Sequence, residues 1–125
     1  MTEKADNLYE ALERIFHEPN RLSIMSALAA SDKGLTFTEL REQCRLTDGN
    51  LNRHLKALEE SRVVKIRKAF VDAKPQTTIA ITSVGLERFS QYLAALSEVL
   101  KAARKAVQTE KEGVPCSANA VRARA

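Results

Sequence analysis

The sequence predicts a mainly α-helical domain that carries one β-hairpin. Apolar residues recur at helical spacing in five stretches, those between 63 and 82 are spaced mostly by two, and capping or turn residues separate the stretches. The chain has 125 residues, of which 44% are hydrophobic. This length is enough for one buried core and too short for two.

The charge is unevenly distributed along the chain, although its net value is only +4. Residues 41–74 hold nine basic and five acidic side chains, whereas residues 1–20 hold two and five. A basic patch on a small domain indicates a polyanion such as nucleic acid, and the alternative is a plain solvated face. The longest uncharged stretch, 75–86, is too short to cross a bilayer, and the N-terminus lacks the apolar region of a secretory signal. We therefore expect a cytoplasmic protein without a membrane partner.

Two helices are expected before residue 31. Leu8, Leu12 and Ile15 share one face of a helix over residues 6–17. Pro19 ends this helix, because proline removes a backbone donor and disfavours helix at the preceding residue. A second helix follows over residues 20–30.

Two further helices follow at close spacing. Thr36 and Glu39 form a capping box that opens a short helix ending at Cys44. Thr47 caps a fourth helix that runs to residue 60. The apolar stripe of this fourth helix comprises Leu51, Leu55 and Leu58.

The hairpin is expected from two strands, 63–71 and 77–82, joined by a turn at 72–75. A long last helix over residues 83–108 then begins at a cap formed by Thr82 or Ser83. Residues 109–125 lack an apolar period and are expected to be a disordered tail, so that the domain spans 1–108. The side chains expected or considered to face inward from the hairpin are Val64, Ile66, Ala69, Phe70, Ile79 and Ile81.

Apolar residues of the last helix alternate in spacings of four and three, as in the seam of a coiled coil. The seam either packs on its own domain or joins two subunits, and we favour the contact between subunits. Its members are Phe89, Leu93, Leu96, Leu100, Ala103 and Val107.

The order of the elements predicts a winged helix-turn-helix, since only three residues separate helices 36–44 and 47–60 and a hairpin follows. Four stretches resemble the small winged-helix transcriptional regulators of the ArsR and MarR type, of the short, stand-alone, DNA-binding kind. The resemblance extends over about residues 8–100. The four stretches are PNRLSIMSAL at 19–28, LTFTEL at 35–40, NLNRHLKALE at 50–59 and ITSVG at 81–85.

One position departs from the pattern of these regulators, which usually end the recognition helix with a glycine. This chain has Arg62 there. A positive φ at Arg62 would cost roughly 1 kcal/mol.

The outer side of helix 47–60, opposite its leucine stripe, is small, polar and basic. Arginine pairs with guanine and asparagine with adenine in the major groove, so this side is suited to reading bases. A merely solvated side would usually carry more glutamate, whereas Glu59 and Glu60 lie only at the far end. The residues expected to read bases are Asn50, Asn52, Arg53 and Lys56.

A second set of residues is expected to contact phosphates or the minor groove from the helix ends and the hairpin. For the hairpin cations, the alternative is protection of a strand edge from aggregation. The set comprises Thr36, Thr38, Arg41, Thr47, Lys65, Arg67, Lys68 and Lys74.

The sequence therefore predicts a homodimeric regulator of transcription, with repression as the expected mode. Its first and last helices form the dimer interface, and two recognition helices about 34–36 Å apart read a pseudopalindromic operator on double-stranded DNA. The alternative is a winged-helix adaptor that binds proteins and no DNA. The expected interface residues are Leu8, Leu12, Ile15, Phe89, Leu93, Leu96 and Leu100.

Catalytic or metal chemistry is not indicated. His17-Glu18 begins like a zinc-protease motif, but Arg21 stands where that motif needs a second histidine. His54 flanks the leucine stripe and is expected to be a packed boundary residue, and Cys44 is expected to be a small hydrophobe. We expect no enzyme activity, no metal and no cofactor, and no residue points to a small-molecule effector.

Overall fold

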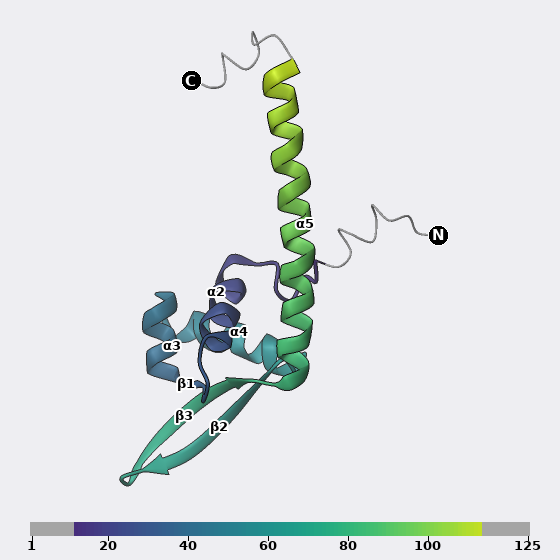
Figure 1. Cartoon of the computed structure of the whole chain (residues 1–125). Helices are drawn as coiled ribbons and strands as arrows, with labels where there is room; N and C mark the ends of the chain where they lie inside the picture. Colours follow the sequence, from purple (N-terminus) through teal and green to yellow (C-terminus); the bar gives the residue numbers. More distant parts are fainter. Residues whose placement is uncertain (1–11, 114–125) are drawn as a thin grey trace.

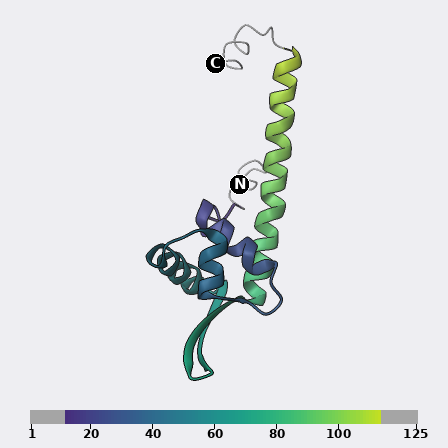
Figure 2. The ribbon, with the colours of Figure 1, turned by 90° about the vertical axis from the view of Figure 1, so that its left-hand side faces the viewer.

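The computed structural model describes residues 12–113, with side chains described from 12 to 109. Its fold is a winged helix-turn-helix: a small cluster of helices from which the β2–β3 hairpin extends on one side and the long α5 helix on the other (Figures 1 and 2). In chain order the elements are α2 (Pro19–Ala29), β1 (Leu35–Thr36), α3 (Phe37–Cys44), α4 (Asp48–Glu60), β2 (Val64–Val71), β3 (Lys74–Ile81) and α5 (Ser83–Gly113).

Each of the three short helices begins at a side-chain cap. The Glu18 side chain accepts a hydrogen bond from the backbone N–H of Arg21, so Pro19 occupies the first turn of α2, where its missing N–H costs nothing. The predicted capping box of Thr36 and Glu39 is present at α3, and Thr47 caps α4. These caps confirm the predicted starts of the three helices to within one residue.

Both α3 and α4 end with an arginine in the left-handed conformation, at φ 57° for Arg45 and 65° for Arg62. After α4, Val63 N–H donates to the Leu58 carbonyl at 3.2 Å and Arg62 N–H donates to the Glu59 carbonyl at 2.9 Å. This is the Schellman arrangement that glycine usually completes. The positive φ at Arg62 therefore costs roughly 1 kcal/mol, and it directs the chain from α4 into the hairpin.

The sheet is antiparallel with strand order β1-β3-β2. Val71 pairs with Lys74, which leaves a two-residue turn in which Asp72 and Ala73 both have positive φ, the pattern of a tight hairpin turn. The predicted turn at 72–75 was therefore too long, because Pro75 belongs to β3. Proline is tolerated there because β1 reaches only Thr78, so β3 has no second neighbour at Pro75.

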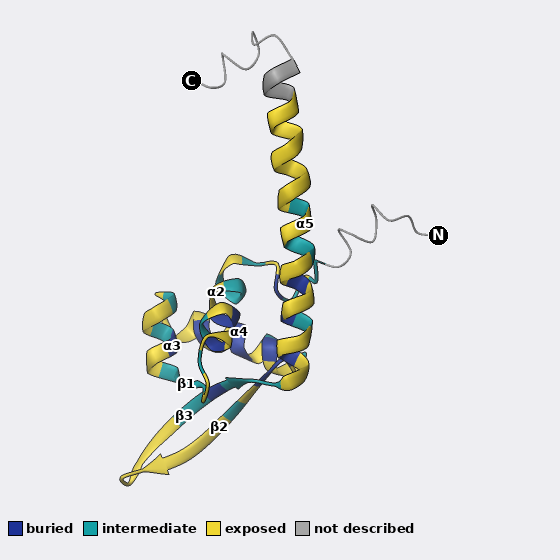
Figure 3. Cartoon of the chain, in the orientation of Figure 1, coloured by how far each residue is buried: buried dark blue, intermediate teal, exposed yellow. Residues whose placement is uncertain are grey.

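The outer half of the hairpin extends beyond the core. Ile79 is buried and Ile66 and Ile81 are half-buried, as expected, but Ala69 and Phe70 are exposed. The expectation that these two residues face inward was wrong, because no described element covers the hairpin beyond Ile66. Figure 3 shows this outer half in yellow.

The core lies where α2, α3, α4 and the base of the hairpin meet the first turns of α5 (Figure 3). The predicted leucine stripe of α4 is buried in it. The buried core residues are Phe16, Ile24, Met25, Leu28, Leu40, Leu51, Leu55, Leu58, Val63, Val64, Ile79, Phe89 and Tyr92.

The segment before α2 is a turn and not the predicted helix. The N–H groups of Phe16 and His17 both donate to the Glu13 carbonyl at 3.0 Å, a single turn that brings the Phe16 ring 5.3 Å from that of Phe89 and 5.5 Å from that of Tyr92. The prediction of a helix over 6–17 is therefore wrong for 12–17, since this turn directs Phe16 into the core. Residues 6–11 lie outside the described part.

The α5 helix is longer than predicted and continues to Gly113. The expected end at 108 and the expected tail start at 109 were wrong, because no glycine or proline interrupts residues 109–112. The rest of the expected tail, 114–125, lies outside the described residues.

The start of α5 is fixed against the end of α4. The Thr82 hydroxyl donates to the Arg62 carbonyl and accepts from Gly85 N–H, both at 2.8 Å. At Gly85 the α5 backbone is so close to Val63 that a Cβ would collide with the Val63 carbonyl. Gly85 is therefore required by the packing of α5 on Val63, in the link between α4 and β2.

We predict that Gly85→Ala lowers the free energy of unfolding by about 2 kcal/mol, because an atom is forced into backbone that has no room to move. Gly49→Ala is the matched control: a Cβ at Gly49 meets nothing within 4 Å, and alanine favours helix over glycine by about 0.5 kcal/mol or more. Urea denaturation of both variants measures the difference. Equal stability of the two variants would contradict the packing described for Gly85.

Candidate nucleic-acid interface

The four residues expected to read bases lie together on the exposed side of α4. Asn50, Asn52, Arg53 and Lys56 are all exposed, whereas the opposite side of the helix is buried in the core. An Arg53 Nη donates to Asn50 Oδ1 at 3.2 Å, one helical turn earlier. This contact uses one of the five N–H donors of an exposed guanidinium.

The polar residues around the N-terminus of α4 hold the helix-turn-helix together. The Thr36 and Thr47 hydroxyls accept backbone N–H groups as caps, so each has only its own O–H left to donate to an external group. Arg41 Nη1 donates to Asp48 Oδ1 at 2.8 Å and so joins α3 to α4. This hydrogen bond, followed by the charge of Asp48, raises the pKa of Arg41. Thr38 is exposed on α3 and has no such role in the described structure.

The register of the hairpin divides its cations between two faces. Lys68 lies on the same face as Ile66 and lines an open groove of about 860 Å³ between the hairpin and α4, together with Asn52 and Lys56. Lys65 and Arg67 lie on the opposite face. Lys74 is exposed beside the turn. The groove thus joins the polar side of α4 to one face of the hairpin.

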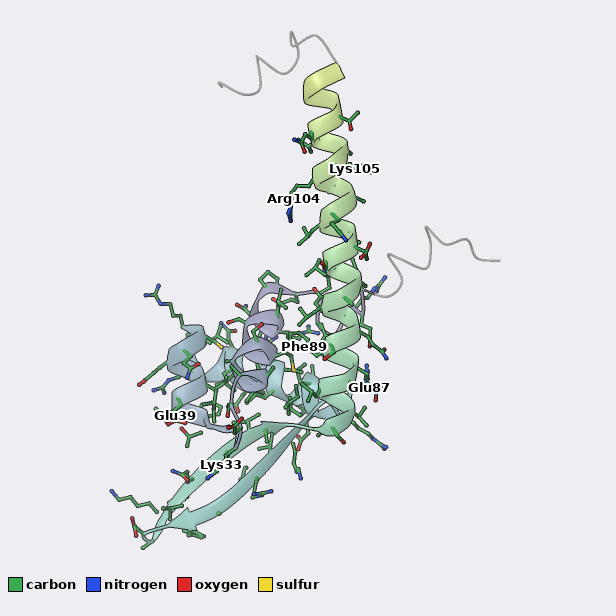
Figure 4. The ribbon with its side chains drawn as sticks, in the orientation of Figure 1. Lys33, Glu39, Glu87, Phe89, Arg104 and Lys105 are labelled. Atoms are coloured by element: carbon green, nitrogen blue, oxygen red, sulfur yellow. The ribbon has the colours of Figure 1, made fainter. Side chains whose placement is uncertain are left out.

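The opposite face of the hairpin carries a second hollow, of about 340 Å³, lined by Lys65, Arg67 and Lys33. Lys33 precedes β1 and lies close to β3 (Figure 4). Lys33 was not predicted to be near the hairpin, because the sequence does not show that residues 35–36 pair with β3. The pairing of β1 with β3 is what brings Lys33 to the hairpin.

His54 is more deeply buried than a boundary residue. It is 3% exposed, and its Nδ1 accepts a hydrogen bond from Arg21 Nε at 3.3 Å and lies 4.0 Å from Glu18 Oε1. Its Nε2 has no partner among the described atoms. Burial lowers the pKa of His54. The negative charge of Glu18 raises this pKa, but by less than burial lowers it. His54 therefore connects α4 to the start of α2 as a neutral imidazole.

The residues expected at a dimer interface fall into different environments. Phe89 is 2% exposed and points from α5 into the helical cluster, whereas Glu87 points away from it (Figure 4). The assignment of Phe89 to the interface was therefore wrong, because Phe89 packs against Phe16 in its own chain. Leu93, Leu100 and Val107 are exposed, Leu12, Ile15 and Leu96 are half-buried against the core, and Leu8 lies outside the described residues.

Tyr92 is one of the residues that pack the first turns of α5 against the core, a role that was not predicted from the sequence. It is buried, and its hydroxyl lies 2.8 Å from His17 Nδ1. On the neighbouring turn, Arg88 forms an ion pair with Glu13 at 2.6 Å and donates to the Ser61 carbonyl at 3.0 Å. Phe89, Tyr92 and Leu96 recur at helical spacing, and this pattern could have indicated the face of α5 that packs on its own core.

The described residues contain no group of three His, Cys, Asp or Glu side chains that could hold a metal ion. Cys44 is half-buried on α3. Within residues 12–113, no helix combines the length and the apolar character needed to span a bilayer.

Comparison with known proteins supports the resemblance seen in the sequence. Residues 20–100 match the family described as winged helix DNA-binding domain. An uncharacterized protein of Methanocaldococcus jannaschii is 34% identical over 88 residues, which cover 70% of this chain and 95% of that protein.

Solved structures of similar proteins have the same fold. A transcriptional regulator homologue from Pyrococcus horikoshii is 31% identical with a TM-score of 0.72, covering 78% of this chain and 97% of that one. MepR of S. aureus, solved with DNA, is 16% identical with a TM-score of 0.63, covering 86% and 87% of the two chains, and so shows the fold alone. Structures described as MarR-family regulators also share the fold.

We predict that the free energy of unfolding falls as the pH drops below about 6.5, the ordinary pKa of histidine. The unfolded chain then binds a proton at His54 that the folded chain excludes, since the folded pKa is lowered. His54→Leu should flatten this dependence between about pH 5 and 7. His17→Asn, which replaces the other histidine, should retain it. Urea denaturation at a series of pH values measures both, and an unchanged slope in His54→Leu would contradict the assignment.

Proposed function

The chain belongs to the winged helix DNA-binding domain family and has the fold of a DNA-binding transcriptional regulator, and from this premise we propose that it reads double-stranded DNA in a sequence-specific manner as a homodimer. The observation that carries the proposal is that the exposed positions of α4 between residues 50 and 56 are all polar or basic. Asn52 and Lys56 line one groove with Lys68 of the hairpin, and Glu59 lies at the same groove. The alternative is a protein-binding adaptor, whose partner would dock on the hairpin or the last helix through large apolar residues; the exposed side of α4 carries no such residue.

In this proposal α4 enters the major groove. Asn50, Asn52, Arg53 and Lys56 all lie on its exposed side, and Gly49 leaves its first turn open, because a Cβ at that position would meet nothing within 4 Å. Arginine donates two hydrogen bonds to guanine, whereas asparagine donates one to adenine and accepts one from it, so these side chains distinguish the two bases. The N-terminus of α4 adds the partial positive charge that favours a nearby phosphate.

The hairpin acts as the wing and contacts the DNA backbone beside the major groove. Residues 64–81 carry four basic side chains and one acidic one. Lys68 continues the groove beside α4, so its ammonium group is placed for the phosphates nearest the recognition helix. Lys65, Arg67 and Lys74 add positive charge on the other face and at the tip, and Thr36, Thr38, Arg41 and Thr47 supply contacts from the helix ends.

The outer part of α5 supports the homodimer. Residues 100–109 are all exposed, and α5 extends well past the helical cluster (Figure 1). An isolated helical segment of this length is marginal in water, so a partner is needed to stabilise it. Leu93, Leu100 and Val107 recur every seven residues, as in the seam of a coiled coil. A second copy offers the same seam, and Leu12, Ile15 and Leu96 lie at its inner end.

A two-fold dimer presents two copies of α4. Recognition helices of such dimers bind half-sites one helical turn apart, about 34–36 Å, so the operator should be pseudopalindromic. A dimer bound across such a site excludes other proteins from it, which makes repression the mode we propose. We place the protein in the cytoplasm.

We predict that Arg53→Ala weakens binding to an operator fragment by about tenfold to a hundredfold, since a bidentate base contact contributes about 1–3 kcal/mol. Lys105→Ala removes one positive charge from α5, far from α4 (Figure 4), and should leave the affinity almost unchanged. Fluorescence anisotropy with a fragment selected from genomic DNA by the wild-type protein measures both. Equal effects of the two substitutions would reject base reading by Arg53.

We predict that Leu100→Glu converts the dimer to a monomer at micromolar concentration, because it places a charge in the apolar seam. Ala102→Glu adds the same side chain about 200° around the helix and should remain dimeric. Analytical ultracentrifugation gives the mass of each variant. A monomeric wild-type protein, or a dimeric Leu100→Glu variant, would refute the α5 interface.

A further inference from the structure

The tip of the wing carries an apolar surface that the proposed phosphate contacts do not use. Phe70 is 76% exposed, more than any other large hydrophobic side chain in the described residues. Its cross-strand partner is Pro75, which is also exposed. Phe70 and Pro75 together form a small apolar surface beyond the reach of the core, which is available for a contact outside the chain.

The register places Phe70 on the side of the wing that faces α4. Alternate residues of a strand share a face, so Phe70 lies on the same face as Lys68 and Ile66. Ile66 and Lys68 line the groove beside α4, together with Asn52 and Lys56. Phe70 and Pro75 therefore form the outer end of the surface that is proposed to face DNA. Val71 lies on the opposite face.

The length of the wing suits the minor groove next to the bound major groove. Phe70 lies four positions beyond Ile66 on β2, which amounts to about 13 Å at 3.3 Å per residue. The centres of neighbouring major and minor grooves are about 17 Å apart, half of a helical turn. A wing whose base lies beside α4 therefore spans most of this distance and brings its tip to the edge of the minor groove. Lys68 lies on the same face as the ring, whereas Lys74 pairs with Val71 and lies on the opposite face, beside the turn. Both are exposed and can bind the phosphates between the two grooves.

We propose that Phe70, supported by Pro75, inserts into the minor groove that flanks each half-site and wedges against a base step there. Phenylalanine and proline are among the apolar side chains that proteins insert between base steps from the minor groove. Such a wedge needs a step that unstacks easily, so it favours TA or CA/TG at that position. Phe70 thus determines specificity at a site that α4 does not touch. This inference rests on the proposed DNA-binding function.

The test compares full-length wild-type protein with Phe70→Ala, Phe70→Leu and Lys74→Ala on one duplex selected from genomic DNA by the wild-type protein. Anisotropy titrations at several salt concentrations separate apolar from ionic contacts. Phe70→Ala should weaken binding by about tenfold with an unchanged salt slope, and Phe70→Leu should retain most of the affinity. Lys74→Ala should reduce the slope by about one.

A second readout locates the ring. 2-Aminopurine placed at the flanking step should brighten when the wild-type protein binds and stay dim with Phe70→Ala, because only a wedged step unstacks. Wild-type affinity of Phe70→Ala, or an unchanged 2-aminopurine signal with the wild-type protein, would overturn the inference while leaving the proposed function intact. Loss of a higher oligomer in Phe70→Ala, with DNA affinity unchanged, would assign the ring to self-association and also overturn it. Absence of DNA binding by the wild-type protein would refute the proposed function itself.

Discussion

The structure depends on the division of α4 into a buried side and an exposed side. Leu51, Leu55 and Leu58 fix the rotation of the helix about its axis, because each is fully or almost fully buried in the core. His54 adds a polar connection to α2 on the same side. With this rotation fixed, positions 50, 52, 53 and 56 of α4 face outward and are exposed. They carry the small, polar and basic side chains on which the proposed function relies.

Two sets of contacts fix the hairpin and α5 relative to α4. The left-handed Arg62 and the close contact between Gly85 and Val63 set the angles at which the hairpin and α5 leave the end of α4. The rings of Phe16, Phe89 and Tyr92 then hold the first turns of α5 against the core. The wing and the outer part of α5 consequently extend in opposite directions (Figure 1). One end is therefore available to a polyanion and the other to a second subunit.

Much of this arrangement was predictable, because local signals decide it. The capping box at Thr36, the cap at Thr47 and the leucine stripe of α4 each depend on residues within a few positions of one another. The predictions were wrong where contacts between residues far apart in the sequence determine the local structure. The spacing of Leu8, Leu12 and Ile15 favoured a helix up to residue 17, but the contacts of Phe16 with α5 produce a turn. The same spacing argument placed Phe89 in a subunit seam, because a single sequence does not show which apolar face meets its own core. The two faces of the wing likewise became distinct only through the register of β2 and β3.

In the proposed dimer, paired α5 helices hold two α4 helices at the repeat of B-DNA. Hydroxyl-radical footprinting of the purified protein on a selected genomic fragment tests this claim most directly. A dimer of this geometry should protect two half-sites related by a dyad, with centres about 10–10.5 base pairs apart. A single protected half-site, or protection without a dyad, would contradict it.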